Sequence, residues 1–145
     1  MSLKRIAELD LENATDLYNK YVNSSNQDYK LLLCYHVEQC VEKCIKYCIE
    51  HTGNEYAHTH DIHNLCNDLL NYYSNYTKTS IENQIEQYIN NDILPYATML
   101  TVWESKSRYD ISFTEVDKNI ILSFSFCNDL LKFCTQLDNC YGPIE

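Results

Sequence analysis

Apolar residues recur every three or four positions through most of this chain, which is the repeat of α-helices that bury one face. Within residues 3–22 a single stripe follows this repeat: Leu3, Ala7, Leu11, Ala14, Tyr18 and Tyr21. The polar run at 23–26 interrupts the stripe, because Asn and Ser side chains compete for backbone hydrogen bonds. A second helix is predicted over residues 27–51, ending before Gly53, which can take the left-handed conformation at a helix end.

Helix-start signals mark two further elements. Asp61 stands in the first turn of a third predicted helix that runs to about Tyr73, with Thr59 or His60 near its cap. Thr79 and Glu82 have the spacing of a capping box, which opens a fourth helix through about residue 91.

The C-terminal third is less regular at its beginning. Pro95 interrupts the pattern, so residues 93–104 are predicted to form a separate or kinked helix and residues 105–113 to be irregular. Thr114 is predicted to cap a last long helix that runs to about residue 139. Gly142 and Pro143 then stop it.

The last predicted helix carries two apolar stripes where one would suffice for a surface helix. The first stripe is Val116, Ile120, Phe124, Cys127, Leu131 and Cys134, and the second is Leu122, Phe126, Leu130, Phe133 and Leu137. Two interpretations are equally open: a central helix buried on most sides, or a seam between two subunits.

Composition supports one helical domain over residues 1–145. Only 2 glycines and 2 prolines occur among the 145 residues, so long uninterrupted elements are expected. No run approaches the roughly 20 apolar residues of a membrane span. Lys4 and Arg5 stand near the start, and acidic residues follow where a signal peptide would need its apolar centre, so a cytoplasmic protein is expected.

The net charge and the positions of the cysteines disfavour some kinds of ligand and site. The formal net charge of −10 disfavours broad coating of a nucleic acid, although a small basic pocket stays compatible with it. Cys40, Cys44 and Cys48 share one helix face and cannot readily bridge each other, so the eight cysteines are expected to act as small apolar residues. A cysteine metal site lacks a C-x-x-C pair, and no metal or cofactor is predicted.

Polar side chains gather beside the apolar face of the second helix. His36, Gln39, Lys43 and Lys46 fall on one flank, with Glu42 adjoining. An imidazole, an amide and two ammonium groups could hold a phosphate or a nucleotide. The alternative is structural: Glu42 and Lys46 form an ordinary helix pair, and His36 is a core-edge histidine with one hydrogen bond.

Two other polar groups could take part. His58, His60 and His63 cluster beside Asp61, a composition that could capture zinc or nickel; the alternative, which we favour, is a hydrated helix start with His60 bonded inward. Arg108 precedes an aromatic residue, which suits a planar or phosphorylated ligand, unless it simply pairs with Asp110.

Three short blocks of this sequence resemble the HEPN family. They are His36 to Lys46 with its polar spacing, then Thr59-His60-Asp61, then Ser107-Arg108-Tyr109, and the likeness spans roughly residues 28–137. The resemblance implies a small up-and-down bundle that commonly dimerises. The expected fold is therefore all-α, an antiparallel up-and-down helical bundle of four to five main helices plus short helical pieces. It also implies a minimal nucleotidyltransferase as partner, often in a toxin–antitoxin pair.

The sequence departs from the catalytic branch of that family, which cleaves RNA with an arginine and a histidine a few residues further on. Arg108 has no histidine in the seven residues that follow it, and Arg5 has none either. We therefore predict no catalytic residues. The prediction is a homodimeric module that binds a nucleotide, RNA or a nucleotidyltransferase through His36, Gln39, Lys43, Lys46, His60 and Arg108. The alternatives are a metal-independent ribonuclease toxin with a rearranged site, in which His36 or His60 substitutes, and a purely structural dimeric protein.

Overall fold

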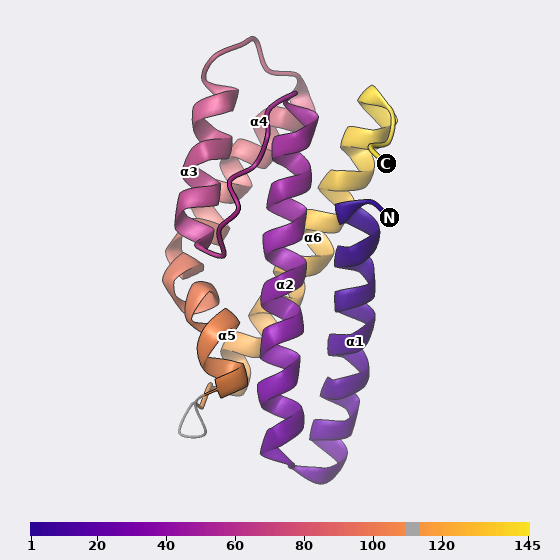
Figure 1. The fold of residues 1–145 in the computed structure, drawn as a ribbon, viewed down its shortest axis with the longest axis vertical. Coiled ribbons are helices and arrows are strands. Elements are labelled where there is room, and N and C mark those ends of the chain that lie inside the picture. The colour runs from indigo at the N-terminus through magenta and orange to yellow at the C-terminus, as the bar shows by residue number, and fades with distance from the viewer. Residues whose placement is uncertain (110–113) are drawn as a thin grey trace.

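The computed structural model describes residues 1–109 and 114–145, with side chains described for 1–107 and 114–145. Over this part of the chain the fold is all-α, as predicted (Figure 1). The elements in chain order are α1 (Leu3–Ser24), α2 (Gln27–His51), α3 (Ile62–Tyr73), α4 (Ser80–Tyr88), a π-helical turn (Ile89–Ile93), a 3₁₀ turn (Leu94–Tyr96), α5 (Ala97–Tyr109) and α6 (Asp117–Tyr141).

Helix α2 stands at the centre of the bundle and packs against α1, α3, α5 and α6. Figure 1 shows α1 and α2 side by side as an antiparallel hairpin, joined by the two residues between Ser24 and Gln27. From Val37 to Ile49 every residue of α2 except Lys43 is buried. The sequence predicted one apolar face and one polar flank, but because neighbours surround α2, most of the flank is buried as well.

Local capping explains where the first helices begin and end. The Asn26 side chain accepts from the backbone N–H of Asp28, and α2 has the bounds that were predicted. The Asp61 side chain accepts from the N–H of Asn64, so Asp61 is itself the N-cap of α3 in place of Thr59 or His60. The predicted capping box of Thr79 and Glu82 is confirmed.

The segment between α4 and α5 differs from the prediction. Helix α4 ends at Tyr88, and the π-helical turn extends the coil through residue 93 before Pro95 enters the first turn of the 3₁₀ segment. Proline fits there because the first turn of a helix has no intrahelical partner for its N–H. Helix α5 then continues to Tyr109, so the irregular segment predicted from residue 105 was wrong for residues 105–109. Residues 110–113 of that segment lie outside the described residues.

Helix α6 begins at Asp117, so the prediction that Thr114 caps it was wrong. Val116 is the N-cap residue, and the neighbouring Glu115 carboxylate accepts from the N–H of Val116 and from the side chain of Asn119. Both predicted stripes contribute to the core, which contains Ile120, Cys127 and Cys134 from the first and Phe126, Leu130 and Leu137 from the second. The reason is that α6 contacts α1, α2 and α4 at once.

The core is rich in thiols. All eight cysteines are reduced, and every one except Cys140 is buried. The Sγ of Cys127 lies 3.5 Å from the carbonyl oxygen of Val37, and the Sγ of Cys134 lies 3.7 Å from that of Cys44. These cysteines therefore serve as small apolar residues where α6 crosses α2. In the part of the chain that the structure describes, none of the helices combines the length and hydrophobicity of a transmembrane segment.

Candidate functional site

The polar side chains of α2 form two connected groups, one of which faces α1. Asp10 of α1 accepts from both basic residues of this group: its Oδ1 lies 2.9 Å from Nδ1 of His36, and its Oδ2 lies 3.0 Å from Nζ of Lys43. The Asp10 side chain is only 12% exposed. A carboxylate held between an imidazole and an ammonium has its charge compensated inside the fold.

Gln39 links this group to the interior of the bundle. Its Oε1 accepts from Nζ of Lys43 at 2.7 Å, and its Nε2 donates to Oε2 of Glu38 at 2.8 Å. Both ends of the amide are therefore used. The chain of contacts runs from His36 through Asp10, Lys43 and Gln39 to Glu38 without leaving the protein.

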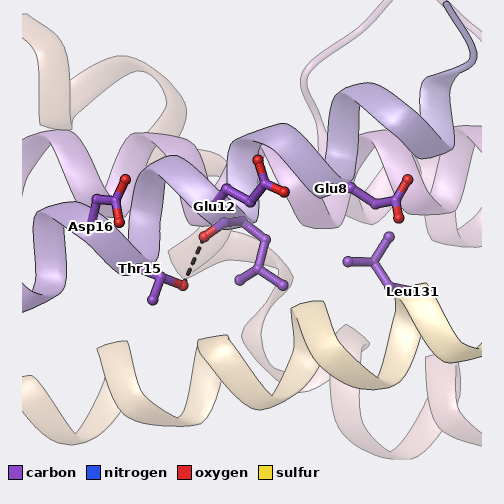
Figure 2. A pocket seen from close by; sticks show the side chains of 6 residues that line it. Glu8, Glu12, Thr15, Asp16 and Leu131 are labelled. Atoms are coloured by element: carbon purple, nitrogen blue, oxygen red, sulfur yellow. Dashed lines mark hydrogen bonds between the residues drawn. The ribbon is translucent and has the colours of Figure 1, made fainter.

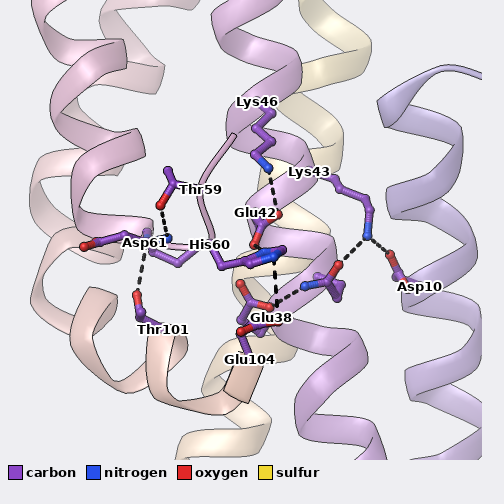
Figure 3. A network of polar contacts seen from close by, with 12 residues as sticks. Asp10, Glu38, Glu42, Lys43, Lys46, Thr59, His60, Asp61, Thr101 and Glu104 are labelled. Atoms are coloured by element: carbon purple, nitrogen blue, oxygen red, sulfur yellow. Dashed lines mark hydrogen bonds and ion pairs between the residues drawn. The ribbon is translucent and has the colours of Figure 1, made fainter. Parts of the chain in front are cut away.

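The second group faces the opposite side of α2 and centres on Glu42, whose side chain is 3% exposed. Its Oε2 accepts from Nζ of Lys46 at 2.9 Å, and its Oε1 lies 2.9 Å from Nδ1 of His60 (Figure 3). The Lys46 ammonium also sits 5.2 Å from the centre of the Tyr56 ring, within the range of a cation–π contact. Lys46 thus has two partners of its own chain.

His60 is the exposed member of the second group, with 60% of its side chain accessible. Two hydrogen bonds hold the loop that carries His60. The N–H of Asp61 donates to Oγ1 of Thr59, and the N–H of Ile62 donates to Oγ1 of Thr101 on α5. Its Nε2 lies 3.8 Å from Oε1 of Glu104, also on α5 (Figure 3). The start of α3, the middle of α2 and the end of α5 therefore meet at this imidazole.

Glu38 is the buried end of the network. Its burial, together with the nearby charges of Glu42 and Glu104, raises the pKa of this carboxyl to about 10, although the Gln39 hydrogen bond lowers it in part. No residue with a described side chain offers a hydrogen bond to its Oε1. A carboxyl in such surroundings is neutral at pH 7, because burial disfavours the charged form.

Comparison with known proteins identifies the family of this bundle. The family model described as HEPN domain matches residues 1–139. The chain belongs to the HEPN family. The match extends beyond the roughly 28–137 expected from the three blocks and includes α1, which supplies Asp10. No curated protein and no solved structure matches the chain significantly.

The structure divides the predicted ligand-binding residues of this HEPN chain into the two groups. His36, Gln39 and Lys43 lie together on the α1 side, and Lys46 and His60 lie together around Glu42. The side chain of Arg108 lies outside the described residues; its backbone is in the last turn of α5, four positions after Glu104. The structural alternative for Glu42 and Lys46, a pair four residues apart, is the arrangement observed.

Sequence reasoning missed three acidic members of the network: Asp10, Glu38 and Glu104. Asp10 did leave a signal, because it falls three residues after Ala7 and four before Ala14, on the apolar stripe of α1. A carboxylate on a buried stripe requires a partner. The partners themselves, 26 and 33 positions away, could not be chosen before the hairpin was known.

Two further histidines of the HEPN chain, His58 and His63, do not join the network. His63 Nδ1 contacts the Asn67 side chain at 3.1 Å on the surface of α3, and His58 packs edge-on against Tyr56. Among the residues described, no three His, Cys, Asp or Glu side chains are grouped as a metal site would require. His60 is bonded inward, as in the interpretation favoured from sequence.

Proposed function

We propose that this HEPN chain is a non-catalytic binding module whose partner is a protein, with a minimal nucleotidyltransferase as the partner class that the family implies. The observation that carries the proposal is the internal pairing of the predicted phosphate-binding groups. His36 and Lys43 share Asp10, and Lys46 and His60 share Glu42, all at 2.9–3.0 Å. Membership of a toxin–antitoxin pair and homodimerisation belong to the same proposal.

Burial and charge weigh against RNA or a nucleotide at these residues. Gln39 and Lys46 are 6% and 8% exposed, so a phosphate could reach them only after the bundle opened. Any phosphate near the two groups would also meet the carboxylates of Asp10, Glu42 and Glu104. With a net charge of −10 over the whole chain, the long-range field adds to that repulsion. A protein partner avoids these costs, since it can bind without opening the network.

Two titrations test the proposal. The purified chain is titrated calorimetrically with a purified minimal nucleotidyltransferase, and separately with AMP and ATP. Heat that saturates with the protein, and none with the nucleotides, supports a partner-binding module. Saturating heat with a nucleotide that is lost in Lys43→Ala would favour the nucleotide-binding interpretation. No heat with any of the three would refute both.

A ribonuclease with a rearranged site is the second candidate, because His60 has one feature of a general base. Its Nδ1 is bonded to the buried Glu42, which fixes the ring, while the imidazole stays largely exposed. Its Nε2 lies 3.8 Å from Oε1 of Glu104, a residue that precedes position 108 of α5 by one helical turn. Incubation with labelled RNA decides between the candidates. Cleavage that disappears in both His60→Ala and Arg108→Ala would establish the enzyme; RNA left intact by the native chain supports the binding module.

A further inference from the structure

A hollow on the described surface is separate from the polar network. It lies between α1 and α6 and has a volume of about 610 Å³ (Figure 2). Leu11 of α1 and Leu131 of α6 provide its apolar part. A second hollow of about 270 Å³, lined by Thr15, Tyr18, Ile121 and Phe124, shares Thr15 with the first. The two hollows adjoin at Thr15, and we call them together the α1/α6 groove.

One wall of the α1/α6 groove is acidic. Glu8, Glu12 and Asp16 follow one another at intervals of four along α1, so they share a face of the helix (Figure 2). Arg5 reaches Glu8 and Glu12 only at 3.9 Å and from an exposed position. Asp16 has no ion pair within the described residues. The wall therefore keeps most of its negative charge, in contrast to the compensated carboxylates of the network.

The floor of the groove leaves apolar surface in contact with water. Ile121 is 56% exposed, although it lies beside the partly buried Phe124 and Tyr18. The groove extends along α1 from Glu8 to Tyr18, a rise of about 15 Å, which corresponds to about three turns of a helix laid along it. An apolar strip of that length next to a row of carboxylates matches one type of ligand, an amphipathic helix with basic residues along one edge.

We propose that the α1/α6 groove binds a basic amphipathic helix of a partner protein, with Lys or Arg residues of the partner pairing with Glu8, Glu12 and Asp16. This inference rests on the proposed partner-binding function and assigns a surface to it. A second copy of the chain fits the groove less well. A two-fold seam there would bring the same acidic wall from both subunits, and like charges repel.

A designed peptide tests the groove without knowledge of the partner. The probe is a labelled helical peptide of about 18 residues with leucines on one face and lysines along its edge. Its binding to the native chain is measured by fluorescence anisotropy. The triple variant Glu8→Gln, Glu12→Gln, Asp16→Asn is expected to lower its affinity at least tenfold, and Ile121→Ser is expected to lower it as well. The same peptide with glutamates for its lysines is expected not to bind.

The matched control is Asp28→Asn, Glu55→Gln, Asp92→Asn, which removes the same charge from exposed positions outside the groove. If this control weakens the peptide as much as the groove variant does, or if the peptide does not bind the native chain, the proposal is overturned. A sedimenting dimer that the groove variant dissociates would also overturn it, in favour of a second copy.

The nucleotidyltransferase titration separates this proposal from the function on which it rests. A partner that binds the native chain and the groove triple variant equally well rules out the groove and leaves the partner-binding function intact. A partner that fails to bind the native chain rules out the function itself.

Discussion

Asp10 shows how one carboxylate can hold two helices of the bundle together. It is the shared partner of His36 and Lys43, and its side chain is mostly buried. An asparagine has the same shape, but one of its two oxygens is replaced by an NH₂ group. That donor would face His36 or Lys43, which now donate to the carboxylate. The cost of such a mismatch at a buried site is about 1–3 kcal/mol.

We expect Asp10→Asn to lower the free energy of unfolding by about 1–3 kcal/mol in urea denaturation. Asp16→Asn is the matched control, because Asp16 lies on the same helix, is exposed and has no ion pair within the described residues. It should change stability by less than about 0.5 kcal/mol. Equal effects of the two substitutions would show that the network contributes nothing.

Substitution of Glu38 is expected to raise the free energy of unfolding, whereas substitution of Asp10 lowers it. Burial raises its pKa above the ordinary 4.5, to about 10, so the folded protein keeps a proton that the unfolded chain loses. Its contribution to stability is complete below pH 4.5 and is lost progressively as the pH rises towards 10. Glu38→Gln removes this titration, and the glutamine keeps an oxygen that can accept from the Gln39 side chain.

The variant should therefore be more stable than the native chain at pH 8, by about 1–3 kcal/mol, and should depend less on pH between 5 and 9. Urea denaturation at a series of pH values measures both. Glu55→Gln, an exposed position, serves as the control. A loss of stability in Glu38→Gln at pH 8 would mean that Glu38 is ionised and paired in the fold.

At the scale of elements, short-range signals predicted most helix ends, whereas long-range contacts decided the rest. Asn26 and Gly53 bracket α2, and each acts within its own turn. Helix α5 continues past Glu104 through two serines, which have only weak helix preference. Tertiary contacts hold this end, because Trp103 is fully buried with its ring N–H donating to Glu115, and Ser107 is buried with its hydroxyl bonded to the Trp103 carbonyl. No local pattern near residue 105 contains that information.

The end of α1 gives a prediction at this scale. Ser25 has a φ of 58°, a left-handed conformation that costs a residue with a Cβ but not a glycine. Ser25→Gly should raise the free energy of unfolding by about 0.5–1 kcal/mol. The same change at the neighbouring Ser24, which is still helical, should lower it by a similar amount. Thermal unfolding of the two variants compares them, and a gain at Ser24 with a loss at Ser25 would contradict the described turn.

At the scale of the whole molecule, Asp138 joins three helices near the chain ends. It accepts from Lys4 of α1 at 3.0 Å and from Tyr47 and His51 of α2 at 2.5 and 2.9 Å. Burial alone would raise the pKa of Asp138, but the hydrogen bonds from Tyr47, Lys4 and His51 outweigh it and lower the pKa below 3.8. Such contacts link segments about 90 or more positions apart, and no sequence pattern indicated them.

The lowered pKa of Asp138 determines how the stability of the protein changes as the pH falls. The contribution of Asp138 to stability is complete above its ordinary pKa of 3.8 and is lost as the pH falls through the lower value of the folded state. Asp138→Asn should thus reduce stability at pH 7 by about 1–3 kcal/mol and flatten the further loss below about pH 4. Denaturation between pH 7 and 2 measures this. An equally steep acid loss in both proteins would contradict it.

The basic groups of α2 and His60 are already paired with the chain's own carboxylates, and this pairing can be tested directly. The five histidines can be assigned by substitution, and their imidazole signals followed by NMR while a short single-stranded RNA is added. The signals of His36 and His60 should stay in place throughout the titration. Saturable movement of both signals, abolished by Lys43→Ala, would contradict the internal pairing and show that the network opens to bind phosphate.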